Sequence, residues 1–201
     1  MGNVIVDLTV SLDGFVAGGG DGPGLPLGRG GELLFPWMNA GPEANRTESG
    51  FTPPDASKVV IDEWTDDCGA LVSGRRTFDI AGGWKDGHPI DVPIFVVTHR
   101  APPEGEWSPR VSFVTAGTGR ALDLALEAAG DRKVSVCSAD VVQQVLRAGR
   151  LDEIHLNVVP LLLGSGVRLF DHLGPDPVRL EQTRTIGSEG VTHLRYRVLK
   201  D

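Results

Sequence analysis

The chain lacks the features that would place it in a membrane or on nucleic acid. No segment approaches the roughly 18 consecutive apolar residues of a membrane-spanning helix. The chain has fewer basic than acidic residues. It contains 19 Lys and Arg against 27 Asp and Glu, which gives a formal net charge of -8. Nucleic acids and anionic membranes both favour clustered basic side chains. We therefore expect neither as a partner, and any phosphate site has to be local.

Cysteine is scarce as well. Cys68 and Cys137 are the 2 cysteines of the chain, and each stands at the edge of an apolar run. Neither has the spacing of a disulfide framework, a metal site or a redox motif. The first residues lack the basic region and long apolar stretch of a secretory signal. We expect two buried thiols and a cytoplasmic enzyme.

Several common signatures of functional sites are missing. The stretch Gly18–Gly24 has Pro23 where the third glycine of a dinucleotide fingerprint belongs, and no Gly-x4-Gly-Lys-Ser/Thr occurs. The five histidines include no pair at metal-ligand spacing, so no metal site is predicted. A Gly-x-Ser-x-Gly elbow is absent, and Gly164-Ser165-Gly166 is expected to form a turn. A nucleophilic triad is harder to exclude, because its members need not be adjacent in sequence.

What the sequence does contain is an alternation of short apolar runs with segments of helical composition. Strands are expected at residues 4–10, 15–17, 69–73, 93–98, 111–115, 133–137, 153–159, 178–186 and 192–199, and helices at 55–66, 77–81, 121–129 and 140–148. This order predicts an α/β fold with a mostly parallel sheet, helices on both faces and a C-terminal antiparallel hairpin. No repeat or linker interrupts residues 1–201, so a single domain is expected.

Residues 18–54 form a long segment rich in Gly and Pro, which punctuate regular structure. Loops of this length in compact domains are usually functional or disordered. This one carries a group of large apolar side chains, namely Leu33, Leu34, Phe35, Trp37 and Met38. We therefore expect an ordered flap.

The junction Leu71–Phe78 has the composition of an anion site. An apolar run ends at Gly74, Arg75 and Arg76 follow, and Thr77 opens a helical segment. Free backbone N–H groups and the positive end of the helix dipole gather at a helix N-terminus. The sequence predicts a phosphate-binding site here, with a tight turn and solvated arginines as the alternative.

Three further patterns occur in a fixed order along the chain. They are Ser-Leu-Asp-Gly-Phe-Val-Ala at 11–17, Gly-Arg-Arg-Thr-Phe at 74–78, and Asp-Glu at 152–153 followed by Pro-Leu-Leu-Leu-Gly-Ser-Gly at 160–166. Together they resemble the dihydrofolate reductase-like family, in the branch of the reductase domain of the bifunctional riboflavin-biosynthesis deaminase/reductase. The resemblance covers nearly the whole chain.

This resemblance implies a three-layer α/β/α dihydrofolate reductase-like fold with a central mixed sheet. It also implies an NADPH-dependent oxidoreductase that transfers a hydride to a small, pterin- or pyrimidine-like heterocycle and acts as a homodimer. The alternative is a non-catalytic nucleotide-binding or interaction module that retains the reductase fold.

The resemblance further implies where NADPH would lie. It places Val16 and Ala17 at the nicotinamide carboxamide, Gly74, Arg75, Arg76 and Thr77 at the phosphates, and Thr98, His99 and Arg100 at the adenosine 2'-phosphate. Guanidinium groups suit that phosphate because they donate paired, charge-assisted hydrogen bonds. For Arg100 the alternative is a solvated loop charge.

One segment departs from the family pattern. Where the family carries Gly-Gly-Ala against the pyrophosphate, this chain has Cys137, Ser138, Ala139 and Asp140. The lost glycines are expected to close backbone conformations with positive φ. Asp140 is expected to cap the following helix, while its carboxylate repels phosphate. We still place Ser138, Ala139 and Asp140 at the cofactor.

The proton that accompanies hydride transfer needs a donor. Asp13 is the candidate catalytic residue because it lies beside the expected nicotinamide site, although Asp-Gly is also a common turn pair. Asp55 and Asp62, on the helix expected at residues 55–66, are alternative candidates for the proton donor. Trp84 is expected either to cover a heterocycle or to pack in the core.

Overall fold

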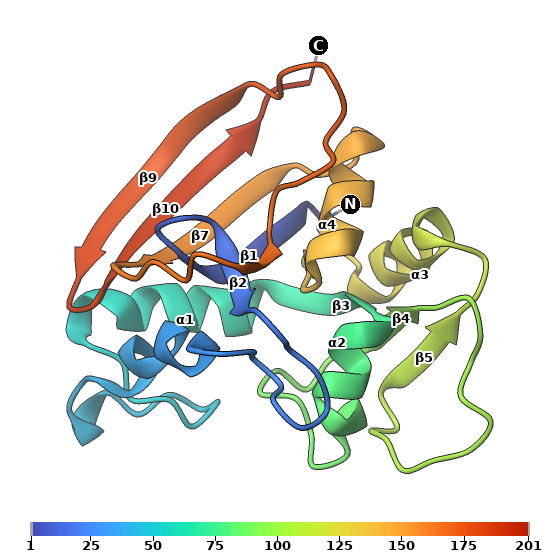
Figure 1. Ribbon diagram of the computed structural model, residues 1–201, viewed down its shortest axis with the longest axis horizontal. Coiled ribbons are helices and arrows are strands. Elements are labelled where there is room, and N and C mark those ends of the chain that lie inside the picture. The colour runs from blue at the N-terminus through green and yellow to red at the C-terminus, as the bar shows by residue number, and fades with distance from the viewer. Residues whose placement is uncertain (1, 201) are drawn as a thin grey trace.

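The computed structural model describes residues 2–200 and consists of a large mixed sheet flanked by helices (Figure 1). The strands are β1 Val4–Ser11, β2 Phe15–Gly18, β3 Cys68–Gly74, β4 Ile94–Val97, β5 Val111–Val114, β6 Lys133–Val136, β7 Glu153–Val159, β8 Gly166–Arg168, β9 Leu180–Ser188 and β10 Val191–Val198. The α-helices are α1 Asp55–Asp67, α2 Arg75–Ile80, α3 Thr118–Ala129 and α4 Ala139–Arg147. Short 3-10 helices are η1 Gly31–Leu34, η2 Pro36–Asn39, η3 Glu43–Asn45 and η4 Gly82–Trp84.

The main sheet has 8 strands in the order β5-β4-β3-β6-β1-β7-β10-β9. Every neighbouring pair from β5 to β7 is parallel. β10 runs antiparallel to β7, and β9 runs antiparallel to β10. β9 and β10 form the long hairpin at one edge of the sheet (Figure 1). The expected mostly parallel sheet with a C-terminal antiparallel hairpin is confirmed.

Alternating residues of the central strands face two different layers, because successive side chains of a strand point to opposite faces. In β3, Ala70 and Val72 belong to the core under α3 and α4, whereas Leu71 packs with Ile94 on the other face. Figure 1 shows α3 and α4 side by side, apart from α1. The aliphatic core under α3 and α4 is the larger one and holds most of the buried Val, Leu and Ala side chains.

The sheet face toward α1 is polar at its centre. Asp7, His155, Asn157 and His193 share this face because they alternate with aliphatic residues of the opposite core. Their hydrogen bonds form a continuous chain: Asp7 Oδ2 to His155 Nδ1 at 3.2 Å, Asn157 Nδ2 to Asp7 Oδ1 at 2.9 Å, and Asn157 Oδ1 to His193 Nδ1 at 2.7 Å. Ser57 of α1 extends the chain at 2.9 Å from His193 Nε2. Burial of polar groups is tolerated only when they are hydrogen-bonded in this way.

The segment 18–54 packs on the sheet as an ordered flap, as expected. The side chains of Leu34 and Trp37 are 0% and 3% exposed. At its base the chain passes so close to itself that a Cβ on Gly28 would lie 2.0 Å from the carbonyl oxygen of Gly18. The flap is therefore part of the folded core.

The structure corrects several expected boundaries. β8 was not predicted; it pairs with β2 outside the main sheet, and Gly166, assigned to a turn, begins it. α2 starts at Arg75, two residues early, because Gly74 is the extended residue before it. The hairpin turn is only Glu189–Gly190, with Gly190 at φ 72°.

One of the two thiols and one helix cap differ from expectation too. Cys68 is buried, and burial raises the pKa of its thiol to about 11. Cys137 is only half-buried. The residue before α4 is Ser138, so Asp140 lies inside the first turn and does not occupy the cap position. Among residues 2–200, no helix combines the length and the apolar character needed to cross a bilayer.

The flap allows a test of its contribution to stability. Leu34→Ala should lower the free energy of unfolding by about 2–5 kcal/mol, because it removes a fully buried side chain. The neighbouring Leu33 is 51% exposed, so Leu33→Ala should cost less than about 0.5 kcal/mol. Urea denaturation followed by circular dichroism measures both. Equal, small effects of the two variants would show that the flap is not packed in solution.

Candidate functional site

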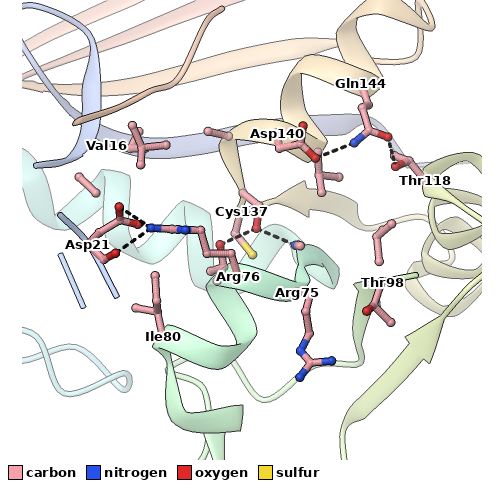
Figure 2. A pocket seen from close by; sticks show the side chains of 18 of the residues that line it. Val16, Asp21, Arg75, Arg76, Ile80, Thr98, Thr118, Cys137, Asp140 and Gln144 are labelled. Carbon is pink, nitrogen blue, oxygen red and sulfur yellow. Dashed lines mark hydrogen bonds and ion pairs between the residues drawn. The ribbon is translucent and has the colours of Figure 1, made fainter. Parts of the chain in front are cut away.

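A cavity of about 710 Å³ opens at the carboxyl ends of the parallel strands β3, β4 and β6. The N-termini of α2, α3 and α4 also face it, as do β2 and the start of the flap (Figure 2). In open α/β sheets ligands bind at this edge, because loops and helix N-termini converge there. The volume lies within the roughly 300–1,000 Å³ typical of small-molecule sites.

The structure brings together all of the residues predicted to contact a cofactor. Every one of them lines this cavity: Val16, Ala17, Gly74, Arg75, Arg76, Thr77, Thr98, His99, Arg100, Ser138, Ala139 and Asp140. They come from β2, from the β3–α2 and β6–α4 junctions and from the end of β4. Their gathering follows from the parallel pairing of β3 with β4 and β6.

Asp13 is not on the wall of this cavity. Its carboxylate accepts hydrogen bonds from Leu163 N at 3.1 Å and Gly164 N at 2.7 Å, and from the Ser11 hydroxyl. The bond from Ser11, followed by those two amides, lowers the pKa of Asp13 to about 2. Asp13 thus fastens the β1–β2 turn to the segment before β8, and its role as a proton donor stays a prediction that this geometry does not support.

The two alternative acids are also engaged elsewhere. Asp55 accepts a hydrogen bond from Asn45 at 2.6 Å, and Asp62 pairs with Lys58 on the exposed side of α1. Trp84 packs edge-to-face on Phe78 at 6.1 Å, within the core that contains Leu71 and Ile94. Core packing, one of its two expected roles, is the one that the structure shows.

Ser138 organises the junction where the family pattern has glycine. Its hydroxyl accepts a hydrogen bond from Gly74 N at 2.7 Å and donates one to Thr77 Oγ1 at 2.7 Å. Its backbone has φ -134°, an ordinary extended value. Cys137, Ser138, Ala139 and Asp140 all lack positive φ, so the junction is built without the conformations that glycine favours. The serine instead joins β3, α2 and α4.

The arginines of the cavity differ in how they are paired. Arg76 donates two hydrogen bonds to the Asp21 carboxylate, at 2.8 and 2.6 Å, and the two side chains face each other in Figure 2. Arg75 pairs with Asp79 at 2.8 Å and reaches the carbonyl oxygen of Arg100. Within residues 2–200, no carboxylate lies at ion-pair distance from Arg100.

The helices α3 and α4 begin at the cavity, at Thr118 and Ala139. Among the described residues, no side chain caps either N-terminus with a hydrogen bond. Their first backbone N–H groups lack intrahelical partners, which makes this wall electropositive. Asp140 and Gln144 bond to each other at 2.7 Å, and Gln144 accepts from Thr118 at 2.6 Å. This chain links the two helices, as Figure 2 shows.

A second cavity of about 180 Å³ adjoins the first and shares Leu8, Phe35 and Cys137 with it. It lies between the polar sheet face, α1 and the flap, and Asp7 and Asn157 are on its wall. Sequence analysis missed this cavity. Its signal was Asp7 itself, a carboxylate in the middle of an apolar strand. No cluster of three metal-binding side chains occurs in the part of the chain that the structure describes.

Comparison with solved structures identifies the fold. A Shewanella sp. PV-4 protein named for riboflavin biosynthesis has 23% sequence identity and a TM-score of 0.69, with 100% of both chains covered. RibD from Acinetobacter baumannii has 16% identity and a TM-score of 0.63, and the alignment covers 99% of this chain but 58% of RibD. Dihydrofolate reductase from Enterococcus faecalis, solved with NADP(H), has 13% identity and a TM-score of 0.57, covering 98% and 97%. The expected dihydrofolate reductase-like fold is confirmed.

Comparison with sequences points to the same group. No curated protein matches the chain. The family model described as the RibD C-terminal domain matches residues 3–192. The resemblance seen in the short motifs therefore extends over nearly the whole chain, and the protein belongs to the RibD C-terminal domain family.

Proposed function

We propose that this protein is an NADPH-dependent oxidoreductase that transfers a hydride to a small heterocycle of the pterin or pyrimidine class. The observation that carries the proposal is the large cavity, whose wall contains every residue that the family resemblance assigns to the cofactor. Membership of the RibD C-terminal domain family supports a reductase. So does the likeness in fold to a dihydrofolate reductase.

The residues present fit a dinucleotide phosphate. The Arg100 guanidinium has no ion-pair partner among the described residues. Arg100 lines the cavity together with Thr98 and His99, and its backbone N–H donates a hydrogen bond to the Thr98 hydroxyl at 3.3 Å. The uncapped N-termini of α3 and α4 add backbone N–H donors on the facing side. Guanidinium groups and free helix amides are the donors that phosphates bind best.

Each part of the wall then has a role. Arg100, with Thr98 and His99, would hold the 2'-phosphate, and Arg75 with the start of α4 would hold the pyrophosphate. Val16 and Ala17 would bear on the nicotinamide. NADPH supplies the hydride when bound, while the chain orients both reactants and excludes water through the packed flap. The negative charge of the Asp140 carboxylate opposes phosphate binding. This carboxylate accepts a hydrogen bond from the Gln144 side chain, one turn further along α4.

One observation favours the second candidate function, a module that keeps the fold without catalysis. Arg76, expected at a phosphate, is already occupied by Asp21, whose side chain is 10% exposed. A phosphate would have to displace this carboxylate or bind beside it. Oxidation of NADPH in the presence of a heterocyclic substrate separates the two functions, because a non-catalytic nucleotide-binding module can bind the cofactor without oxidising it.

NADPH should bind at least tenfold more tightly than NADH, since a charge-assisted hydrogen bond is worth about 1.5–3 kcal/mol. Arg100→Gln should remove most of this preference while leaving NADH affinity unchanged. Isothermal titration calorimetry measures both constants. Arg110→Gln is the matched control, because Arg110 pairs with Asp91 just before β5, away from the cavity. Equal affinities of the unaltered protein for the two cofactors would contradict the assignment of the 2'-phosphate.

Asp21→Asn should strengthen NADPH binding by roughly twofold to fivefold, the effect of releasing one ion pair whose arginine is exposed to solvent. The reason is that Arg76 loses a competing carboxylate and gains freedom to reach phosphate. Asp91→Asn breaks the Arg110 pair and serves as the control for the change in net charge. Weaker NADPH binding by Asp21→Asn in the same titration would mean that the pair orders the site and that Arg76 does not bind phosphate.

A further inference from the structure

The two ends of the larger cavity differ in what their hydrogen-bond donors already bind. One end, the junction end, is formed by the β3–α2 and β6–α4 junctions, and the other, the β4 end, by the residues that follow β4. A phosphate gains most from donors that have no other acceptor, because each bond it forms elsewhere has to replace an existing one. The state of each donor therefore indicates where an anionic ligand can be held.

At the junction end, a side-chain hydroxyl occupies the backbone donor that precedes α2. Ser138 Oγ accepts a hydrogen bond from Gly74 N and donates one to Thr77 Oγ1, both at 2.7 Å. The Ser73 hydroxyl lies 3.1 Å from the same oxygen. Ser138 and Ser73 are 6% and 0% exposed, so this group of hydroxyls is closed off from solvent. The donor at the start of α2 is thus satisfied within the chain.

Two carboxylates engage further groups at the same end. The Asp21 carboxylate accepts two hydrogen bonds from Arg76, and the Asp21 carbonyl oxygen accepts a third at 2.7 Å (Figure 2). Asp140 lies in the first turn of α4, where it accepts a hydrogen bond from Gln144. A carboxylate in a first helical turn offsets the positive end of the helix dipole and repels a phosphate placed there. The junction end therefore carries negative charges of its own.

The β4 end has the opposite character. Arg100 is held by its backbone, since its N–H donates to Thr98 Oγ1 and its carbonyl oxygen accepts from Thr98 Oγ1 and from Arg75. Among residues 2–200, no acceptor bonds its guanidinium. A guanidinium presents five N–H donors in a planar fork that matches a phosphate. The β4 end thus combines a fixed backbone with a full set of free donors.

We propose that Asp21, Ser138 and Asp140 are specificity-determining residues, which fill the junction end so that the cavity holds a nucleotide through a phosphate at the β4 end. This inference rests on the proposed function, which places the 2'-phosphate of NADPH at Arg100. The pyrophosphate then lies against groups that already have partners or beside a carboxylate, and it adds little to affinity. The chain thereby selects nucleotides with a 2'-phosphate over those, such as NADH or ATP, whose phosphates all extend from the 5' carbon.

Small adenosine phosphates test this inference with the full chain in isothermal titration calorimetry. Adenosine 2'-monophosphate and its 5' isomer have the same base and the same charge, and the 2' isomer should bind roughly tenfold more tightly or better, the effect of one hydrogen bond to a charged group. Adenosine 2',5'-bisphosphate carries both groups and should exceed the 2' isomer by less than about threefold, the small effect of an exposed charged contact.

Three results would overturn the inference. The first is equal or tighter binding of the 5' isomer. The second is a gain from the second phosphate that exceeds about threefold. The third is absent binding of the 2' isomer by a chain that binds NADPH, because the affinity would then come from another part of the cofactor.

Variants of the junction end give an independent measurement of the gain from the second phosphate. Asp140→Asn removes an exposed charge without changing the size of the side chain, and Ser138→Ala frees the amide of Gly74. In each variant the gain should rise to about tenfold, as one hydrogen bond to a charged group becomes available or one repulsion is lost. Asp123→Asn is the matched control, because Asp123 pairs with Arg150 outside the cavity, and it should keep the gain of the unaltered chain.

A gain that stays small in both Asp140→Asn and Ser138→Ala would show that these side chains do not determine the choice. Because the Asp140 side chain is exposed, Asp140→Asn keeps the test decisive if Ser138→Ala fails to fold, which thermal denaturation by circular dichroism would reveal. The proposed function fails separately, if the unaltered chain binds NADPH without oxidising it while these ratios hold.

Discussion

The two-residue alternation of the central strands is the constraint on which the rest of this structure depends. In β1 and β7, one set of side chains is aliphatic and packs under α3 and α4, while the other is polar and faces α1. The aliphatic set provides the burial that stabilises the sheet. The polar set is tolerated because Asp7, His155, Asn157 and His193 satisfy one another along a continuous chain. A shift of register by one residue would exchange the two faces and leave these groups unpaired.

Parallel pairing creates the larger cavity. Because β3, β4 and β6 run in the same direction, their carboxyl ends and the helices that follow meet at one edge of the sheet. The N-termini of α3 and α4 and the residue Arg100 then line the same cavity. Ser138 holds the junction together, because its hydroxyl accepts a hydrogen bond from Gly74 N and donates one to Thr77 Oγ1.

The flap joins the two cavities into one functional region. Phe35 lines both, and Trp37, two residues later, lines the smaller cavity and packs at 5.1 Å on His193 of the polar chain. The same segment contributes Asp21, which holds Arg76 at the mouth of the larger cavity. A segment whose glycines and prolines predict a loop therefore supplies part of the wall of both cavities.

The sequence by itself determined the order of most elements and the parallel sheet with its closing hairpin, because these follow from local periodicity. Part of the wall of the larger cavity was predicted too, through the resemblance of short motifs to a known family. Those motifs lie at strand ends, where parallel pairing brings them together. Only the tertiary structure decided the roles of individual acids: Asp13 fastens a turn, while Asp7 lines a cavity. It also revealed β8, the pairing of Arg76 with Asp21 and the hydrogen bonds of the Ser138 hydroxyl. The physical reason is that hydrogen-bond partners lie far apart in the chain, as Asp7 and His155 do, and no local pattern specifies which of them meet.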